Sequence, residues 1–285
     1  MSRRGTLCEA ERVRSAPFTL DLPFTTAFGV TGPDTDLHHQ GDIDEIHPLA
    51  SVSKPIAALA VLVAIDRALL DLDEPAGPEG ATVRHLMAHT AGYPFDGADP
   101  IAQPGARRIY SNTGFEVLGA VVEDATGYDL SDWVEQTVIQ PLSLVSLDVG
   151  GSPAAGYRGS VRDLLAVGRE LLRPTLISTE LWREATSCQF PGLGGILPGF
   201  GRQATNDWGL GFEIRDGKDP HWTGAHSSPR TFGHFGQSGS FLWVDPDADL
   251  AAAFLGTEPF SPAHAEAWPP LTDAILDRFA TGGAA

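Results

Sequence analysis

Ser51 and Lys54 stand three positions apart at the beginning of a long apolar segment. Positions i and i+3 of a helix lie on the same face, so the two side chains would be within reach of each other. Burial at the mouth of an apolar helix disfavours the charged form of a lysine, and the neutral amine then accepts a proton from a hydroxyl near neutral pH. The first-turn N–H of Ser51 would face a developing oxyanion. The pair predicts a serine nucleophile with a lysine activator, although Ser-x-x-Lys also occurs by chance as a helix cap followed by a solvated lysine.

A second group, Tyr110, Ser111 and Asn112, lies on a loop directly before a predicted helix, where a phenol and an amide would face a cleft. Capping of that helix by Asn112 and Thr113 is the simpler interpretation, but it gives Tyr110 no role. The neighbouring arginines at positions 107 and 108 would favour the phenolate form of Tyr110, or they face solvent.

A third group is the glycine-dense segment 233–239, Gly-His-Phe-Gly-Gln-Ser-Gly, just before a predicted strand. Glycines allow a backbone to approach a ligand closely, so an edge strand here could supply a second oxyanion donor. A bulged or tightly turned strand is the alternative interpretation.

Four segments therefore follow one another along the chain: 51–54 (Ser-Val-Ser-Lys), 86–92 (Leu-Met-Ala-His-Thr-Ala-Gly), 110–112 (Tyr-Ser-Asn) and 234–236 (His-Phe-Gly). In this order they resemble the class C β-lactamase-like family, which includes class C β-lactamases, D-stereospecific aminopeptidases, DD-peptidases and carboxylesterases. The resemblance covers most of the chain, from about residue 29 to residue 279.

The resemblance implies an acyl-enzyme mechanism. In it, Ser51 attacks a carbonyl, Lys54 and Tyr110 shuttle the proton, and Asn112 orients the substrate or the lysine. The backbone N–H groups of Ser51 and Gln237 would form the oxyanion hole, and water would then hydrolyse the ester intermediate.

Residues 234–236 depart from the Lys-Thr-Gly of penicillin-directed members, because His234 and Phe235 replace the lysine and the threonine and leave only Gly236 in common. A histidine there resembles the esterases and aminopeptidases of the family. The expected substrate is therefore a small ester, with an amide-directed D-peptidase or a weak β-lactamase as the alternative. A non-catalytic binding protein on the same fold is the alternative from another class, since motifs alone do not prove turnover.

The elements that must position these residues are strands at both ends of the chain and helices between them. Period-2 patterns and turn residues predict strands, and apolar stripes with capping residues predict helices. The strands are expected at 24–30, 208–214, 231–235, 240–244 and 250–255, and the helices at 51–70, 83–89, 113–127, from 129 or 131 to Pro141, 161–172, 178–185 and 270–279.

This order predicts an α/β (α+β) fold of the β-lactamase/transpeptidase type. Both termini would build an antiparallel sheet lobe flanked by helices, from about residues 15–50 and 205–285, and a mostly helical lobe, about 51–204, would be inserted between them. The whole chain, 1–285, is expected to be a single catalytic domain.

The formal net charge of −18 repels phosphate backbones and anionic lipids, so no nucleic-acid or membrane partner is expected. The longest apolar run is too short to span a bilayer, and no export signal is readable. The two cysteines, Cys8 and Cys188, cannot build a disulfide framework. A cytoplasmic location and a small-molecule ester or amide substrate are predicted, and the oligomeric state is left open.

Neither a metal nor another cofactor is expected. His85 and His89 have the i, i+4 spacing of a zinc helix, but Leu86 occupies the place where a metalloprotease motif needs a glutamate. The segment 216–230 is predicted to be a loop near the substrate cleft. Three residues could line this cleft, Trp208, Trp222 and His226, although Trp208 is more typical of a core residue.

Overall fold

The computed structural model describes residues 18–280 of the chain, so Cys8 lies outside the described residues. The centre of the fold is a six-stranded antiparallel sheet in the order β2-β1-β10-β9-β8-β7. Strand β1 from near the N-terminus pairs with β10 from near the C-terminus, with Ala27 opposite Leu255. The strands are β1 (Thr26–Thr31), β2 (Asp36–Gln40), β7 (Glu213–Ile214), β8 (Phe232–Gly236), β9 (Ser240–Asp245) and β10 (Leu250–Gly256). The predicted sheet built from both ends of the chain is confirmed.

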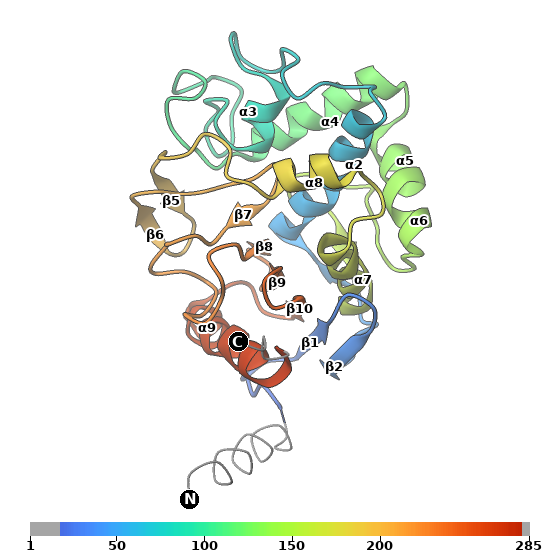
Figure 1. Cartoon of the computed structure of the whole chain (residues 1–285), viewed down its shortest axis with the longest axis vertical. Helices are drawn as coiled ribbons and strands as arrows, with labels where there is room; N and C mark the ends of the chain where they lie inside the picture. The colour runs from blue at the N-terminus through green and yellow to red at the C-terminus, as the bar shows by residue number, and fades with distance from the viewer. Residues whose placement is uncertain (1–17, 281–285) are drawn as a thin grey trace, which may run out of the picture.

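Helices cover both faces of this sheet (Figure 1). On one face, α9 (Pro262–Phe279) buries Trp268 and Ile275 against Phe28 and Trp243. On the other face, α7 (Val161–Leu172) contacts β1, β9 and β10. Side chains alternate along each strand between the two faces, as the pleat requires, and two separate hydrophobic clusters result.

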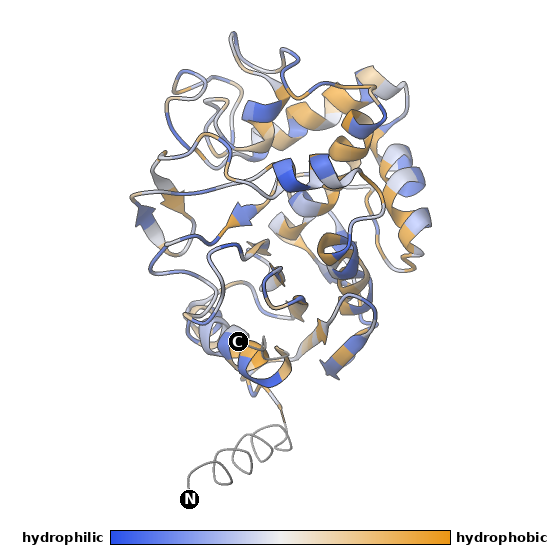
Figure 2. Ribbon diagram, viewed as in Figure 1, coloured by the Kyte–Doolittle hydropathy of each residue, from blue (hydrophilic) through white to orange (hydrophobic). Residues whose placement is uncertain are grey.

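The helical lobe surrounds α2 (Ser53–Asp66), in which every residue from Ser53 to Ala64 is buried. Figure 2 shows the apolar character of this helix, and Pro55 occupies its first turn, where the missing N–H costs nothing. The other helices are α3 (Val83–Met87), α4 (Asn112–Thr126), α5 (Leu130–Val134), the π-helix η2 (Glu135–Ile139), α6 (Gln140–Leu142) and α8 (Thr179–Ala185).

Short elements connect the lobes. A 3-10 turn, η1 (Ala50–Val52), precedes α2 directly. Two small two-stranded sheets pair β3 (His47–Pro48) with β4 (Arg158–Gly159) and, as a hairpin, β5 (Gly195–Leu197) with β6 (Gly201–Gln203). The β5–β6 hairpin lies between the helical lobe and the sheet at the edge that carries β7 (Figure 1). No helix in the described range 18–280 is both long and apolar enough to cross a membrane.

Several predicted boundaries are wrong. Helix α4 begins at Asn112, because Ser111 rather than Thr113 accepts the capping hydrogen bond, from the N–H of Gly114. The helical path continues through Pro141, which lies in the first turn of α6 and so needs no N–H partner there. The strand predicted over 208–214 shrinks to β7, because Trp208 only forms an isolated bridge with Glu213.

The last helix begins eight residues earlier than predicted. Ser261 and His264 form a capping box at the start of α9, and Pro269 and Pro270 lie inside the helix. The buried side chains of His264 and Trp268 anchor its first half in the core, and this packing outweighs the helix-breaking tendency of the prolines.

Candidate active site

Ser51 lies in the 3-10 turn η1, which is fixed to the structure from two sides. The Ser53 hydroxyl donates to Ala50 O at 2.6 Å and accepts from the N–H of Tyr157 at 3.0 Å. On the sheet side, the Ser240 hydroxyl donates to Leu49 O at 2.7 Å. The turn therefore holds Ser51 between the helical lobe and the edge of the sheet.

Lys54 is fully buried one turn further on, and its Nζ lies 3.5 Å from Ser51 Oγ. The ammonium donates to Asn112 Oδ1 and to the backbone oxygen of Ala154, both at 2.7 Å. Burial lowers the pKa of Lys54 to about 7, although the carboxylates of Glu116 and Asp96 partly oppose the shift. Near neutral pH a large share of this amine is therefore uncharged.

Tyr110 donates a hydrogen bond from its hydroxyl to Ser51 Oγ at 2.7 Å. Its ring lies against Lys54, with Nζ 4.7 Å from the ring centroid. Burial raises the pKa of Tyr110 above its ordinary value, so this phenol is neutral at working pH. Tyr110 is therefore a neutral hydrogen-bond donor to Ser51.

The arginines beside Tyr110 do not make it a phenolate. Arg107 is exposed, and the buried guanidinium of Arg108 donates to the backbone oxygens of Ala88, Gln189 and Phe190. The suggestion that these arginines favour the phenolate form is wrong, because desolvation dominates the pKa of Tyr110.

Asn112 is the first residue of α4 and connects two groups. Its Oδ1 accepts from Lys54, and its Nδ2 donates to Asp96 Oδ1 at 3.1 Å. The amide therefore fixes the position of the lysine amine relative to Ser51.

Strand β8 supplies the opposite wall of the site. His234 Nδ1 donates to the backbone oxygen of Phe235 at 2.6 Å, and within the described residues no partner is found for Nε2. Burial, together with the nearby charge of Lys54, lowers the pKa of His234 to about 3. The imidazole is therefore neutral, with its unprotonated nitrogen at Nε2.

Gly236 ends β8 where the strand meets the nucleophile turn. A Cβ at this position would lie 2.5 Å from Leu49 O and would also collide with the Ser240 hydroxyl. The absence of a side chain allows β8 to approach Ser51 closely.

A cavity of about 280 Å³ opens beside the nucleophile. Four of the predicted site residues line it, namely Ser51, Tyr110, His234 and Gln237. Lys54 and Asn112 lie behind Ser51. Gly236 packs against the turn η1 that carries Ser51. The other lining residues are Phe95, Ile196, Leu197, Pro198, Trp208, Glu213 and Phe235.

Two residues suggested for the cleft lie elsewhere. Trp222 is fully buried in the core beside Phe235, and the exposed His226 pairs with Asp277 at 3.0 Å. Only Trp208 lines the cavity, and it is also buried.

His89, part of the segment 86–92 and half of the His85/His89 pair, supports the site. Its Nδ1 accepts from the N–H of Ser111 at 3.1 Å, and its ring packs on Tyr110 and Trp208 at centroid distances of 4.7 and 4.5 Å. No group of His, Cys, Asp and Glu side chains suited to a metal occurs among residues 18–280.

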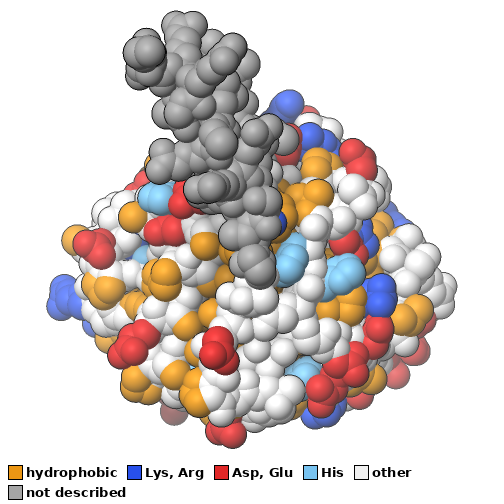
Figure 3. All heavy atoms as spheres, turned by 90° about the horizontal axis from the view of Figure 1, so that it is seen from below, with side chains coloured by type: hydrophobic (Ala, Val, Ile, Leu, Met, Phe, Trp, Pro, Cys, Tyr) orange, Lys and Arg blue, Asp and Glu red, His pale blue; other side chains and the backbone are white. Residues whose placement is uncertain are grey.

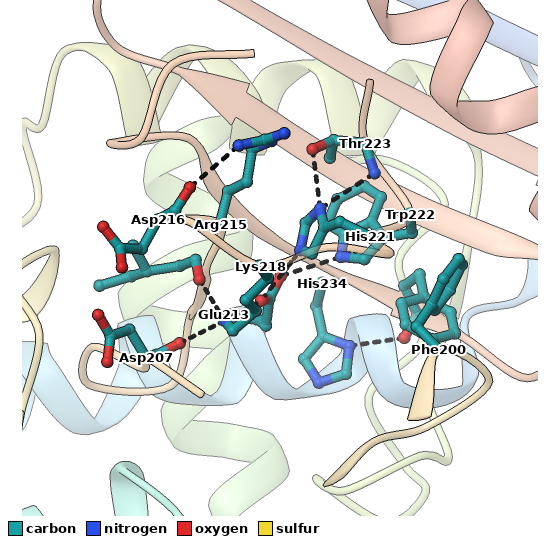
Figure 4. A network of polar contacts seen from close by, with 12 residues as sticks. Phe200, Asp207, Glu213, Arg215, Asp216, Lys218, His221, Trp222, Thr223 and His234 are labelled. Atoms are coloured by element: carbon teal, nitrogen blue, oxygen red, sulfur yellow. Dashed lines mark hydrogen bonds and ion pairs between the residues drawn. The ribbon is translucent and has the colours of Figure 1, made fainter. Parts of the chain in front are cut away.

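Glu213 is a lining residue that the sequence did not indicate. Its carboxylate binds Lys218, accepts from the indole N–H of Trp222 at 2.9 Å and contacts His221 Nε2 at 3.0 Å (Figure 4). Burial opposes ionisation, but the charges of His221 and Lys218 hold the pKa of Glu213 below its usual range. A loop of no regular pattern supplies these partners, so no sequence signal marks them.

Comparison with known proteins places the chain in a family of hydrolases. The Beta-lactamase family model matches residues 24–276, and the chain belongs to that family.

A solved structure described as a beta-lactamase from Mycobacterium bovis is 45% identical in sequence, with a TM-score of 0.89 over 90% of this chain and 96% of that one. EstCE1, a hydrolase with promiscuous acyltransferase activity, is 18% identical over 97% of this chain and 100% of its own, and its TM-score of 0.72 shows a shared fold.

Penicillin-binding protein 4* of Bacillus subtilis is 24% identical in an alignment of 163 residues, with coverage of 42% of this chain and 36% of that protein. The chain spans less than half the length of the first curated relatives that it matches.

Proposed function

We propose that the chain is a serine acyl hydrolase that cleaves small esters through an acyl-enzyme at Ser51. The observation that carries this proposal is the position of Ser51 Oγ, 2.7 Å from the hydroxyl of Tyr110 and 3.5 Å from Nζ of Lys54. A hydroxyl between a neutral phenol and an amine with a pKa of about 7 has the environment of an activated nucleophile.

In the proposed first step, Ser51 Oγ attacks the ester carbonyl and its proton passes to the neutral amine of Lys54. The carbonyl oxygen becomes an oxyanion that the backbone N–H groups of Ser51 and Gln237 stabilise. When the tetrahedral intermediate collapses, Tyr110 donates a proton to the departing alcohol, and Lys54 returns the stored proton to Tyr110.

In the proposed second step, water attacks the acyl group on Ser51. The amine of Lys54, neutral again, accepts a proton from this water through the hydroxyl of Tyr110, and the same donors hold the second oxyanion. On collapse the acid leaves, and the proton held by Lys54 passes through Tyr110 to the departing Ser51 Oγ, which restores the serine hydroxyl and the neutral amine, so protons balance over the cycle.

The preference for a neutral ester rests on β8. His234 is uncharged at working pH, so this wall has no cation to pair with a substrate carboxylate. The walls near it are hydrocarbon, from Phe235, Trp208 and Leu197. Both features favour a substrate whose group at this wall is uncharged.

A second candidate is hydrolysis of a β-lactam or another amide. It is favoured by the 45% identity to the Mycobacterium bovis protein described as a beta-lactamase. The neutral His234 makes β-lactam hydrolysis less favourable, because β-lactams carry a carboxylate and this histidine has no positive charge to pair with it.

The test compares the wild-type protein with Ser51→Ala on p-nitrophenyl acetate and butyrate, a chromogenic cephalosporin and a D-alanyl amide. We expect wild-type turnover of the two esters, little or none of the amides, and a loss of at least about 1,000-fold in kcat for Ser51→Ala. Equal ester turnover by both proteins would refute the proposal, and faster cleavage of the cephalosporin than of the esters would favour the second candidate.

A further inference from the structure

Phe95, Ile196, Leu197 and Pro198 are apolar residues that line the cavity beside Ser51, and together they are called the apolar strip. We infer that this strip binds an extended hydrocarbon arm of the ester substrate, an inference that rests on the proposed function. It names the chemical class of the substrate, which the catalytic residues alone do not.

The strip contacts the ring of Tyr110 and also includes side chains that are exposed to solvent. The ring of Phe95 stacks on the ring of Tyr110 at a centroid distance of 5.9 Å, next to the hydroxyl that contacts Ser51. Phe95 and Ile196 nevertheless remain 52% and 65% exposed. Isolated exposed apolar side chains are common, but two that line the cavity of the nucleophile together form a binding surface.

The strip is anchored to the fold on both sides. The backbone oxygen of Phe95 accepts from the N–H of Asn112 at 2.8 Å, which ties this loop to the start of α4. On the other side, the buried Leu197 belongs to the same hydrophobic cluster as Phe200 and Phe235, whose rings pack at 5.6 Å. A surface held in this way is formed before a ligand arrives, as ligand sites commonly are.

The cavity offers no free charge to a polar arm. The carboxylate of Glu213 is buried and already bound by Lys218, His221 and Trp222. A charged or strongly polar arm would lose its hydration along the strip without gaining a partner, whereas an alkyl chain gains from leaving water.

The experiment measures kcat/KM over two series of substrates. One series is p-nitrophenyl esters from acetate to octanoate, which lengthens the acyl arm. The other is alkyl acetates from methyl to hexyl, which lengthens the alcohol arm. In the wild type we expect kcat/KM to rise in one series, by up to about fourfold for each methylene group that the strip buries.

Ile196→Ser should lower the ratio of long-chain to short-chain kcat/KM in that same series by about fivefold to tenfold, since it removes one wall of the strip. The matched control is Val145→Ser, which changes a side chain that is 82% exposed and outside the cavity, and it should keep the wild-type ratio. The responding series identifies which arm lies on the strip.

Three outcomes overturn the inference. If the wild type hydrolyses acetates through Ser51 but neither series depends on chain length, or Ile196→Ser keeps the wild-type ratio, the strip does not bind the arm and the proposed function stands. If no ester is hydrolysed in a Ser51-dependent way, both the inference and the proposed function fail.

Discussion

In the proposed mechanism, three side chains share the chemistry: Ser51 is the nucleophile, Lys54 the base and Tyr110 the acid. Burial shifts the pKa values of Lys54 and Tyr110 in opposite directions, because desolvation favours the neutral form of each side chain. It lowers the pKa of the amine and raises that of the phenol. The same environment thus favours a neutral amine at Lys54 and a neutral phenol at Tyr110, as the proposed base and acid require.

The pH dependence of ester hydrolysis tests the role of Lys54. A base must be deprotonated to act, so kcat/KM should rise with pH and level off above an apparent pKa of about 7. One unit below that pKa only about a tenth of the amine is neutral, which predicts about a tenfold loss. A pH–rate profile from 5.5 to 9 checks this.

Lys54→Arg is the control for the profile, because a guanidinium stays protonated over this range and cannot act as a base. We expect its activity to fall by at least about 1,000-fold. A wild-type profile that stays flat across neutral pH would contradict the assignment of Lys54 as the base.

The residues of this site differ in how far the sequence could predict them. The motifs indicated Ser51, Lys54, Tyr110 and Asn112, because spacing along the chain carries that information. The backbone oxygen of Ala154, which binds Lys54, has no side-chain signature. Contacts between distant segments with no pattern of their own appear only in the folded chain.

At the scale of elements, the site is a junction between the turn η1, strand β8 and the start of α4. The close approach of β8 to η1 depends on Gly236, where an added Cβ would meet Leu49 O and Ser240. This junction sets the distance between Ser51 and the proposed oxyanion donor of Gln237.

Gly236→Ala should therefore separate β8 from the nucleophile turn. We expect it to lower the free energy of unfolding by about 1–3 kcal/mol, as overpacking does, and to lower kcat/KM by at least about tenfold. Urea unfolding and ester kinetics measure the two effects.

Gly256→Ala, in β10, is the matched control, because the nearest atoms to its added Cβ lie at an ordinary 3.5 Å. It should leave stability and activity close to the wild type. If Gly236→Ala behaves like this control, close packing at the end of β8 is not what positions the site.

Helix prediction succeeded where local signals agreed and failed where packing decided. The bounds of α7 were predicted correctly, since Ser160 caps an amphipathic stretch of 12 residues. For helix α4 the sequence indicated Asn112 and Thr113 as the capping residues, whereas in the folded chain Ser111 is the cap. Helix α9 continues through two prolines because Trp268 and His264 are held in the core, which no local pattern reveals.

At the scale of the whole molecule, the sequence predicted a sheet built from both ends of the chain with helices on its faces, and this prediction is confirmed. The sheet joins two segments that are distant in the sequence at one site. On the face drawn in Figure 3, acidic, basic and apolar side chains are interspersed. The net charge of −18 still disfavours nucleic-acid and anionic membrane partners. The absence of such partners, the single domain and the cytoplasmic location stay predictions.

The central claim is that Ser51 of the folded protein is a nucleophile, and the most direct measurement is the intact mass of the whole chain after exposure to a fluorophosphonate. The account predicts one covalent adduct per chain, located at Ser51 by peptide mapping and absent from Ser51→Ala and from the urea-unfolded wild type. A folded wild-type protein that forms no adduct at Ser51, or one that Ser51→Ala also forms, would contradict it.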